Sequence, residues 1–289
     1  MAFLDIASAA GFMLCLGIVL ASILALANRK LYVYEDPRIE EVVEMLPHAN
    51  CGACGKPGCR PFAEALVKGE IDPALCTPNS QVMTEEIAEY LGVELGDHTQ
   101  RVARLACAGG AHVAYFRVEY SGLESCRAAA LVSGGGKGCT WGCLGLGDCK
   151  TVCEFDSIRM NKYGLPVVDE DHCVACSDCV EVCPKDLFSI QPVTHKLWVA
   201  CKSLSEGDEA EHDCEVACTA CARCVADAPE GLIQMEANLA VIDFSKNELA
   251  SKVAIERCPT GAIVWIEDHK TVKGLGAKKI LRMEPLPRG

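Results

Sequence analysis

The sequence predicts an α+β protein in which a long N-terminal helix precedes a small helical unit and two related domains of short helices and strands. Three observations predict this order. Residues 7–27 carry no charge, residues 34–95 show helical spacing of apolar side chains around a cysteine loop, and residues 139–265 contain an internal repeat. Because a repeat indicates duplicated structural units, its two copies are expected to fold alike.

The uncharged run Ala7–Ala27 is predicted to be a transmembrane anchor. A helix of this length spans roughly 30 Å, which is about the hydrocarbon thickness of a bilayer. Asp5 precedes the run, whereas Arg29 and Lys30 follow it, so the positive-inside rule predicts that the chain after residue 30 is cytoplasmic. A cleaved signal peptide is the alternative, but the basic segment that it requires before the apolar run is missing.

The composition limits the partners and the use of cysteine. The chain has 289 residues, 21 cysteines and a formal net charge of −13. This cysteine content is far above that of an ordinary soluble enzyme, and disulfides are rare in the cytoplasm. Metal or cluster ligation is therefore the expected use. Lysine and arginine form no basic stripe, so no nucleic-acid partner is expected.

Residues 34–95 are expected to form a compact helical unit around one cysteine loop. Helices are predicted over Arg38–Met45 and Pro61–Lys68, and Thr84 is expected to cap a third. The loop supplies Cys51, Cys54, Cys59 and Cys76. Zinc is one possible occupant of such a loop. A [4Fe-4S] cluster is favoured, because the neighbouring glycines let backbone N–H groups approach the sulfur atoms.

The repeat is visible in three pairs of segments. GLPVVDEDHC (164–173) matches NLAVIDFSKN (238–247), CPKDLFSI (183–190) matches CPTGAIVW (258–265), and CTWGCLGLGDCKTVC (139–153) superposes on CEVACTACARCVADA (214–228). Each copy is predicted to contain a cysteine loop, a short helix, a strand pair and a second cysteine loop. This is the layout of a small two-cluster ferredoxin domain.

The repeat also predicts the domain boundaries. A two-cluster ferredoxin-like domain is expected over 139–200 and a degenerate one-cluster copy over 201–289. Residues 96–138 are expected to connect the first copy to the helical unit, with a flexible joint at 133–138. The segment Gly142–Gly147 resembles a nucleotide-binding loop, but we expect it to pack a cluster loop, because a lone glycine pattern is weak evidence.

The first copy is predicted to bind two clusters. Cys173, Cys176, Cys179 and Cys183 fit the C-x2-C-x2-C-x3-C-P run of bacterial ferredoxins, in which the fourth cysteine ligates the other cluster. Cys153 is therefore expected to complete the site of Cys173, Cys176 and Cys179. The other loop is irregular, because Leu146 occupies the position of its middle cysteine. We assign Cys139, Cys143, Cys149 and Cys183 to its cluster, with Cys107 or Cys126 as alternatives to Cys139.

The second copy is predicted to bind one cluster through Cys218, Cys221, Cys224 and Cys258. Ala228 stands at the position of Cys153, and residues 246–253 lack the other three ligands. All four ligands of one site are thus lost together, as swapped ligation predicts. About four [4Fe-4S] clusters are expected in all. Cys201 and Cys214 are expected to be structural thiols, with an incomplete extra site as the alternative, and Cys15 a small apolar side chain.

Together these features resemble the B subunit of the Rnf (also Rsx) membrane complexes, which are ion-translocating ferredoxin:NAD⁺ oxidoreductases. The resemblance rests on the N-terminal anchor, the 51–76 loop, CTWGCLGLGDCKTVCEFDSIRM and DHCVACSDCVEVCPKD, and GCLGLGDC is its most specific part. The extra C-terminal copy resembles the longer members. Glu154 departs from the family, because a proline usually follows the cysteine at that point.

The resemblance implies an electron relay on the cytoplasmic side of the bacterial inner membrane. Its partners would be soluble ferredoxin, the membrane subunits, and the companion subunits that carry flavins and the NAD site, in a complex that couples electron flow to Na⁺ or H⁺ movement. With one span and no Rossmann loop, this chain is expected to have no catalytic site of its own. The alternative function is a membrane-anchored redox sensor or an assembly factor for another redox complex.

Overall fold

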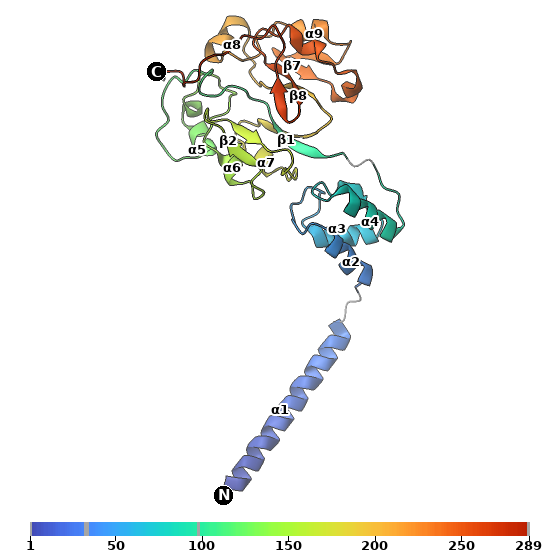
Figure 1. The fold of residues 1–289 in the computed structure, drawn as a ribbon. Helices are drawn as coiled ribbons and strands as arrows, with labels where there is room; N and C mark the ends of the chain where they lie inside the picture. Colours follow the sequence, from blue (N-terminus) through green and yellow to red (C-terminus); the bar gives the residue numbers. More distant parts are fainter. Residues whose placement is uncertain (1, 32–34, 97–98, 288–289) are drawn as a thin grey trace.

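The computed structural model describes residues 2–31, 35–96 and 99–287 and contains a long helix, a helical unit and a body of short helices and strands (Figure 1). The predicted α+β class and the order of these parts are confirmed. Residue 34, where the predicted helical unit begins, and residues 97 and 98 of the predicted connection lie outside the described residues.

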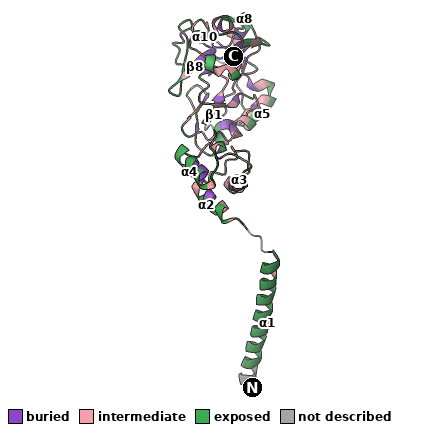
Figure 2. Ribbon diagram, turned by 90° about the vertical axis from the view of Figure 1, so that its right-hand side faces the viewer, coloured by how far each residue is buried: buried purple, intermediate pink, exposed green. Residues whose placement is uncertain are grey.

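Helix α1 (Ala2–Leu31) contains the uncharged run. Its segment Ala10–Leu31 is long and apolar enough, by length and composition, to cross a membrane. The described side chains of α1 are exposed almost throughout, so they do not pack against the described parts of the body (Figure 2). Arg29 and Lys30 lie in its last turn, where cations interact favourably with the helix dipole. Helix α1 is therefore a candidate membrane span.

The helical unit packs three helices around one apolar core. Its elements are α2 (Pro37–Met45), α3 (Cys59–Val67), the 3₁₀ turn η1 (Pro73–Leu75) and α4 (Gln81–Leu91). Val42, Phe62 and Ile87 are each at most 1% exposed and belong to this core. Cys76 belongs to it as well, so the packing of the helices positions one end of the cysteine loop.

Helix α4 begins earlier than predicted. Ser80 is its N-cap, and the Ser80 Oγ accepts a hydrogen bond from the Met83 N–H at 3.2 Å. Thr84 lies inside the helix, where its fully buried Oγ1 donates to the Ser80 carbonyl at 2.9 Å. The predicted cap at Thr84 is therefore wrong, because a serine one turn earlier satisfies the free N–H groups equally well.

The first copy of the repeat extends from residue 101 to residue 192. Its elements are β1 (Arg101–Leu105), α5 (Cys126–Leu131), η2 (Ser133–Gly135), α6 (Asp148–Thr151), β2 (Ile158–Met160), β3 (Pro166–Val168), α7 (Asp178–Val182) and β4 (Phe188–Pro192). The β2–β3 hairpin is antiparallel, and β1 pairs antiparallel with β4. Residues 96–138, predicted to be a connection, thus supply a strand of the first copy.

The second copy extends from residue 197 to residue 272. Its elements are β5 (Leu197–Val199), α8 (Gly207–Asp213), α9 (Arg223–Asp227), β6 (Ile233–Glu236), β7 (Leu239–Ile242), η3 (Phe244–Leu249), α10 (Val253–Glu256), β8 (Ile263–Glu267) and β9 (Lys270–Val272). Strand β5 pairs with β8 as β1 pairs with β4, and it begins before the predicted boundary at 201.

Matching hydrogen bonds show that the two copies begin in the same way. After β1, the Ala106 N–H donates to the Leu187 carbonyl at 2.8 Å, and after β5, the Ala200 N–H donates to the Ala262 carbonyl at 2.8 Å. Leu187 and Ala262 occupy matching positions in the repeated segments that follow the C-P dipeptides. The duplicated unit therefore starts at the strands β1 and β5, and a cysteine follows Ala106 and Ala200 alike.

The helical unit contacts the first copy through its cysteine loop. The Thr77 Oγ1 donates to the Val174 carbonyl at 2.7 Å, and the Arg101 guanidinium donates to the Ala53 carbonyl at 3.5 Å. Val174 directly follows Cys173, so the loop of the helical unit lies against a cysteine loop of the first copy.

Replacing Ile87 by alanine is expected to loosen the helical unit. Ile87 is 1% exposed, so its truncation leaves a cavity that lowers the free energy of opening by about 2–5 kcal/mol. Val82 on the same helix is 63% exposed, and Val82→Ala should change this free energy by less than about 0.5 kcal/mol. Hydrogen exchange of the α2–α4 amides measures the free energy of opening in both variants. Equal protection in the two variants would contradict the assigned core.

Candidate functional site

Three of the four predicted cysteine groups each line a single cavity. The groups are Cys51, Cys54, Cys59 and Cys76; Cys153, Cys173, Cys176 and Cys179; and Cys218, Cys221, Cys224 and Cys258. The cavities measure about 290, 310 and 370 Å³ in that order, and most of their other lining atoms are apolar. Four thiols around a small apolar cavity form a donor set that suits an iron–sulfur cluster.

The cysteine loops of the two copies bend in the same way around their central position. Ala175 and Ser177, on either side of Cys176, have φ values of 58° and 77°, and Ala220 and Ala222, on either side of Cys221, have values of 57° and 54°. A non-glycine residue in this left-handed region costs about 1–2 kcal/mol. The bend turns successive N–H groups toward one concave side, where they can stabilise negative charge on sulfur. The strain is thus located where ligands are expected.

The segment Gly142–Gly147 has this same bend. Gly145 and Gly147 have φ values of 78° and 84° and flank Leu146, which holds the central position. A Cβ on Gly145 would also lie 2.6 Å from the Gly164 carbonyl oxygen, closer than real Cβ contacts. The bend of a cysteine loop therefore accounts for both glycines. This supports the interpretation that the segment packs a cluster loop.

The structure does not place Cys139 in one cavity with Cys143, Cys149 and Cys183. Burial raises the pKa of the Cys149 thiol to about 12, and the nearby Cys126 and Cys183 raise this pKa further. Burial likewise raises the pKa of Cys143 to about 12, with Cys107 and Cys126 among its neighbours. Of the two alternatives to Cys139, Cys107 therefore lies near Cys143, whereas Cys126 lies near both Cys143 and Cys149.

Side-chain hydrogen bonds hold Cys126 beside this loop. Cys126 is the first residue of α5, and the preceding Ser125 caps that helix. The Asp148 Oδ2 accepts hydrogen bonds from the Ser125 Oγ at 2.9 Å and from the Arg127 N–H at 3.2 Å. Because Asp148 directly precedes Cys149, these bonds fix the start of α5 against the irregular loop.

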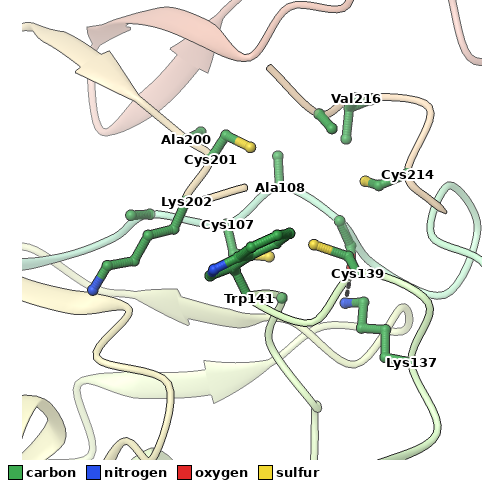
Figure 3. A pocket seen from close by; sticks show the side chains of 14 residues that line it. Cys107, Ala108, Lys137, Cys139, Trp141, Ala200, Cys201, Lys202, Cys214 and Val216 are labelled. Atoms are coloured by element: carbon green, nitrogen blue, oxygen red, sulfur yellow. Dashed lines mark hydrogen bonds between the residues drawn. The ribbon is translucent and has the colours of Figure 1, made fainter. Parts of the chain in front are cut away.

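Cys139 lies in a different cavity, together with Cys107, Cys201 and Cys214 (Figure 3). This cavity measures about 310 Å³, within the range of the cavities lined by the three predicted cysteine groups. In Figure 3 the sulfur atoms of the four side chains turn toward the same space, with Cys201 and Cys214 on opposite sides of it. Cys201 and Cys214 were expected to be structural thiols, so this grouping was not predicted.

A sequence signal for this grouping was available. Leu105-Ala106-Cys107 repeats as Val199-Ala200-Cys201. The signal is short, and the long insertion between Cys107 and Cys139 separates it from the recognised repeat.

Some thiols of these groups have raised pKa values, and others accept backbone hydrogen bonds. Burial raises the pKa of Cys76 and of Cys179 to about 12, so their uncharged forms are favoured without a positively charged partner. The Ala103 N–H donates to the Cys173 Sγ at 3.4 Å, and the Leu187 N–H donates to the Cys183 Sγ at 3.5 Å. Such bonds offset the charge of a metal-bound thiolate and tune the potential of a cluster.

The described cysteines form no disulfides, and their groups surround cavities larger than a single metal ion. All of them are free thiols. Among the described residues, no three His, Cys, Asp or Glu side chains converge closely enough to hold a single metal ion. The four-sulfur groups are therefore defined by the cavities and neighbours given above.

Two family models match the chain at the cysteine loops. Residues 46–78 match a family described as "Putative Fe-S cluster", and residues 166–188 match the "4Fe-4S binding domain" family. The first match covers the loop for which zinc was the alternative, and its description agrees with the iron–sulfur prediction. The second match covers the loop of Cys173, Cys176, Cys179 and Cys183.

Curated relatives match most of the chain. The B subunit of the Na⁺-translocating ferredoxin:NAD⁺ oxidoreductase complex of Acetobacterium woodii is 38% identical over 86% of this chain and 74% of its own length. The B subunit of the proton-translocating ferredoxin:NAD⁺ oxidoreductase complex of Clostridium ljungdahlii is 37% identical over 87% of this chain and 89% of its own. The B subunit of the ion-translocating oxidoreductase complex of Methanosarcina acetivorans is 33% identical over 86% and 94%.

Replacing Asp148 by alanine is expected to free α5 from the irregular loop. The change removes the acceptor of both bonds to α5, and hydrogen bonds to a charged group contribute about 1.5–3 kcal/mol each. Hydrogen exchange should therefore become faster at the amides of residues 126–131 and remain unchanged in the helical unit. Asp148→Asn keeps an acceptor oxygen and serves as the matched control. Unchanged exchange of α5 in Asp148→Ala would show that these bonds do not hold it.

Proposed function

Because the chain belongs to the family of B subunits of ion-translocating ferredoxin:NAD⁺ oxidoreductase complexes, we propose that it is the membrane-anchored iron–sulfur electron-transfer subunit of such a complex. The observation that carries this proposal is the set of cavities lined by four cysteines each, which recur from the helical unit to the second copy. The chain contributes to the oxidoreductase as a subunit and performs no separate substrate chemistry.

Four [4Fe-4S] clusters are proposed for this function. Their ligands are Cys51, Cys54, Cys59 and Cys76; Cys126, Cys143, Cys149 and Cys183; Cys153, Cys173, Cys176 and Cys179; and Cys218, Cys221, Cys224 and Cys258. Cys126 replaces Cys139 in the second group, on the contacts of α5. When bound, a [4Fe-4S] cluster supplies one-electron oxidation and reduction at low potential.

The residues between these groups keep neighbouring sites in contact. The Thr77–Val174 hydrogen bond joins the loop of the helical unit to the loop of Cys173. Within the first copy, Cys149 lies among the groups that raise the pKa of Cys179, after burial and the neighbouring cysteines of its own loop. These contacts support a row of sites that begins in the helical unit and enters the first copy, as an electron relay requires.

Helix α1 is proposed to anchor this row on the cytoplasmic side of a bacterial inner membrane. Arg29 and Lys30 at the end of α1 support that orientation through the positive-inside rule. The proposed partners are soluble ferredoxin, the membrane-embedded subunits and the subunits that carry flavin and the NAD site. The three relatives carry the names of such complexes, and this chain takes the position of their B subunit.

Replacing Cys126 by alanine is expected to remove one cluster. The purified full-length variant should contain about four fewer iron atoms per chain than the unchanged protein, because a cubane that loses one of four thiolates is held poorly. Cys15→Ala in the anchor is the matched control and should leave the iron content unchanged. If Cys126→Ala retains all of its iron and keeps its EPR spectrum, Cys126 is not a ligand of this group.

Reduced ferredoxin tests the function itself. In the purified complex, a low-potential ferredoxin is expected to reduce clusters of this chain within the time of turnover, as followed by EPR. Removing iron from this chain in the assembled complex should abolish ferredoxin-dependent NAD⁺ reduction. If ferredoxin reduces none of the clusters, the relay function is wrong. If turnover survives the loss of this chain's iron, the redox-sensor or assembly-factor function is favoured instead.

A further inference from the structure

We propose that Cys107, Cys139, Cys201 and Cys214 hold a fifth [4Fe-4S] cluster, located between the two copies of the repeat (Figure 3). The inference rests on the proposed function only for the chemistry of the cluster. It adds a binding site that the first copy and the second copy form jointly.

The cavity of this site has the same character as the others. It measures about 310 Å³, the same as the cavity of Cys153, Cys173, Cys176 and Cys179. Small or apolar residues, among them Ala108, Ala200 and Val216, line most of the remainder, and Lys137 and Lys202 line the rest. Cys139 and Cys214 are 9% and 5% exposed, and Cys107 and Cys201 are half-buried, so the site is largely shielded from water.

The four cysteines are two equivalent pairs. Cys107 and Cys201 each follow the first strand of their copy and an alanine. Cys139 and Cys214 each open the segment in which CTWGC superposes on CEVAC. Each copy therefore contributes the same two positions to one shared site. A chance grouping of structural thiols gives no reason for this correspondence.

Equivalent hydrogen bonds connect the site to its two neighbours. The Cys143 N–H donates to the Cys107 Sγ at 3.4 Å, and the Cys218 N–H donates to the Cys201 Sγ at 3.3 Å. Cys143 and Cys218 are themselves proposed ligands in the first and second copies. One hydrogen bond thus joins a proposed ligand of the central site to a proposed ligand of the neighbouring site in each copy. The central site closes the gap between the copies and makes the row of sites continuous.

Close backbone contacts bring the two pairs together. The Ala108 N–H donates to the Ala200 carbonyl at 3.0 Å, and Ala114 forms an antiparallel bridge with Cys214. A Cβ on Gly109 would lie 2.9 Å from the Cys214 Sγ, so the approach of Cys214 requires a glycine at this position. The copies meet through small residues at the point where the four thiols gather.

Lys137 supplies a positive charge at this site. Its side chain is 6% exposed, lines the cavity, and donates from Nζ to the carbonyl oxygens of Gly109 and Cys143. Four thiolates give an iron–sulfur cluster a net negative charge. A nearby cation favours the reduced, more negative state and so raises the reduction potential. Lys137 is therefore a positioning and tuning residue, not a ligand.

The proposal also accounts for the cysteine inventory. With this site and the four groups of the proposed function, every cysteine except Cys15 in α1 is assigned as a ligand. Ligation is balanced when each of the four thiols forms one Fe–S bond to a preformed cluster and displaces the thiolate by which a carrier held that iron, which leaves with the proton that the incoming thiol releases. No oxidant or reductant is needed for this exchange.

Iron counting on paired variants of the full-length protein tests the assignment. The unchanged protein should contain about twenty iron atoms, whereas four clusters would give about sixteen. Cys214→Ala should lose about four. Adding Cys139→Ala to Cys214→Ala should cause no further loss, because both residues bind the same cluster. Adding Cys126→Ala to Cys214→Ala should double the loss, because the two residues bind different clusters.

Lys137→Met provides a readout that does not depend on removing a ligand. In an EPR redox titration, it should lower the midpoint potential of one cluster and leave the iron content unchanged. Lys150→Met, an exposed lysine on α6, is the control and should leave that potential unchanged. A signal that disappears in Cys214→Ala and shifts in Lys137→Met belongs to the central cluster.

The outcomes separate this proposal from the proposed function. About sixteen irons, together with full retention of iron in Cys214→Ala, would overturn the fifth site and leave the relay in place. Losses that add fully for Cys139→Ala and Cys214→Ala would also overturn it. Failure of the relay would instead appear as clusters that ferredoxin cannot reduce, whatever the iron count.

Discussion

The structure depends on a conformational constraint at its cysteine loops. In the loops of both copies, the residues on either side of the central position lie in the left-handed region. Such a loop curls around a small volume and points its N–H groups inward, so that buried sulfur can carry negative charge. The constraint explains why Gly145, Ala175 and Ala220 stand at equivalent positions: each has a small side chain or none. It also leaves little of each copy for regular strands, which are at most five residues long.

The apolar cores are built around the ligands. Cys76 belongs to the core of the helical unit, Cys149 and Cys179 to that of the first copy, and Cys224 to that of the second. Cys139 and Cys214 lie in the cluster of buried residues between the copies. Only 6% of the chain is aromatic, so few large side chains fill the interior. Bound clusters then complete the packing, which links cofactor binding directly to stability.

The spacing of cysteines predicted local arrangements well and long-range arrangements poorly. The groups at 51–76, 153–179 and 218–258 were predicted as the fold arranges them, because short spacing and swapped ligation leave few alternatives. Cys139 was assigned by proximity in sequence. The insertion that contains α5 hid the relation of Cys107 to Cys201, so the contribution of β1 to the first copy was not predicted, and Cys126 was named only as an alternative to Cys139. The Thr84 error has a similar origin, because two hydroxyl residues one turn apart are equivalent as caps.

The distribution of ligands along the chain has a consequence for biosynthesis. Cys51 to Cys76 are complete before either copy leaves the ribosome, so the helical unit can acquire its cluster first. Cys107 and Cys139 emerge before Cys201 and Cys214, and until then they supply only one half of the proposed site. The junction of the copies can be completed only after Cys201 and Cys214 have been translated. Insertion of the proposed central cluster must therefore follow synthesis of ligands from both copies, unlike insertion into the helical unit.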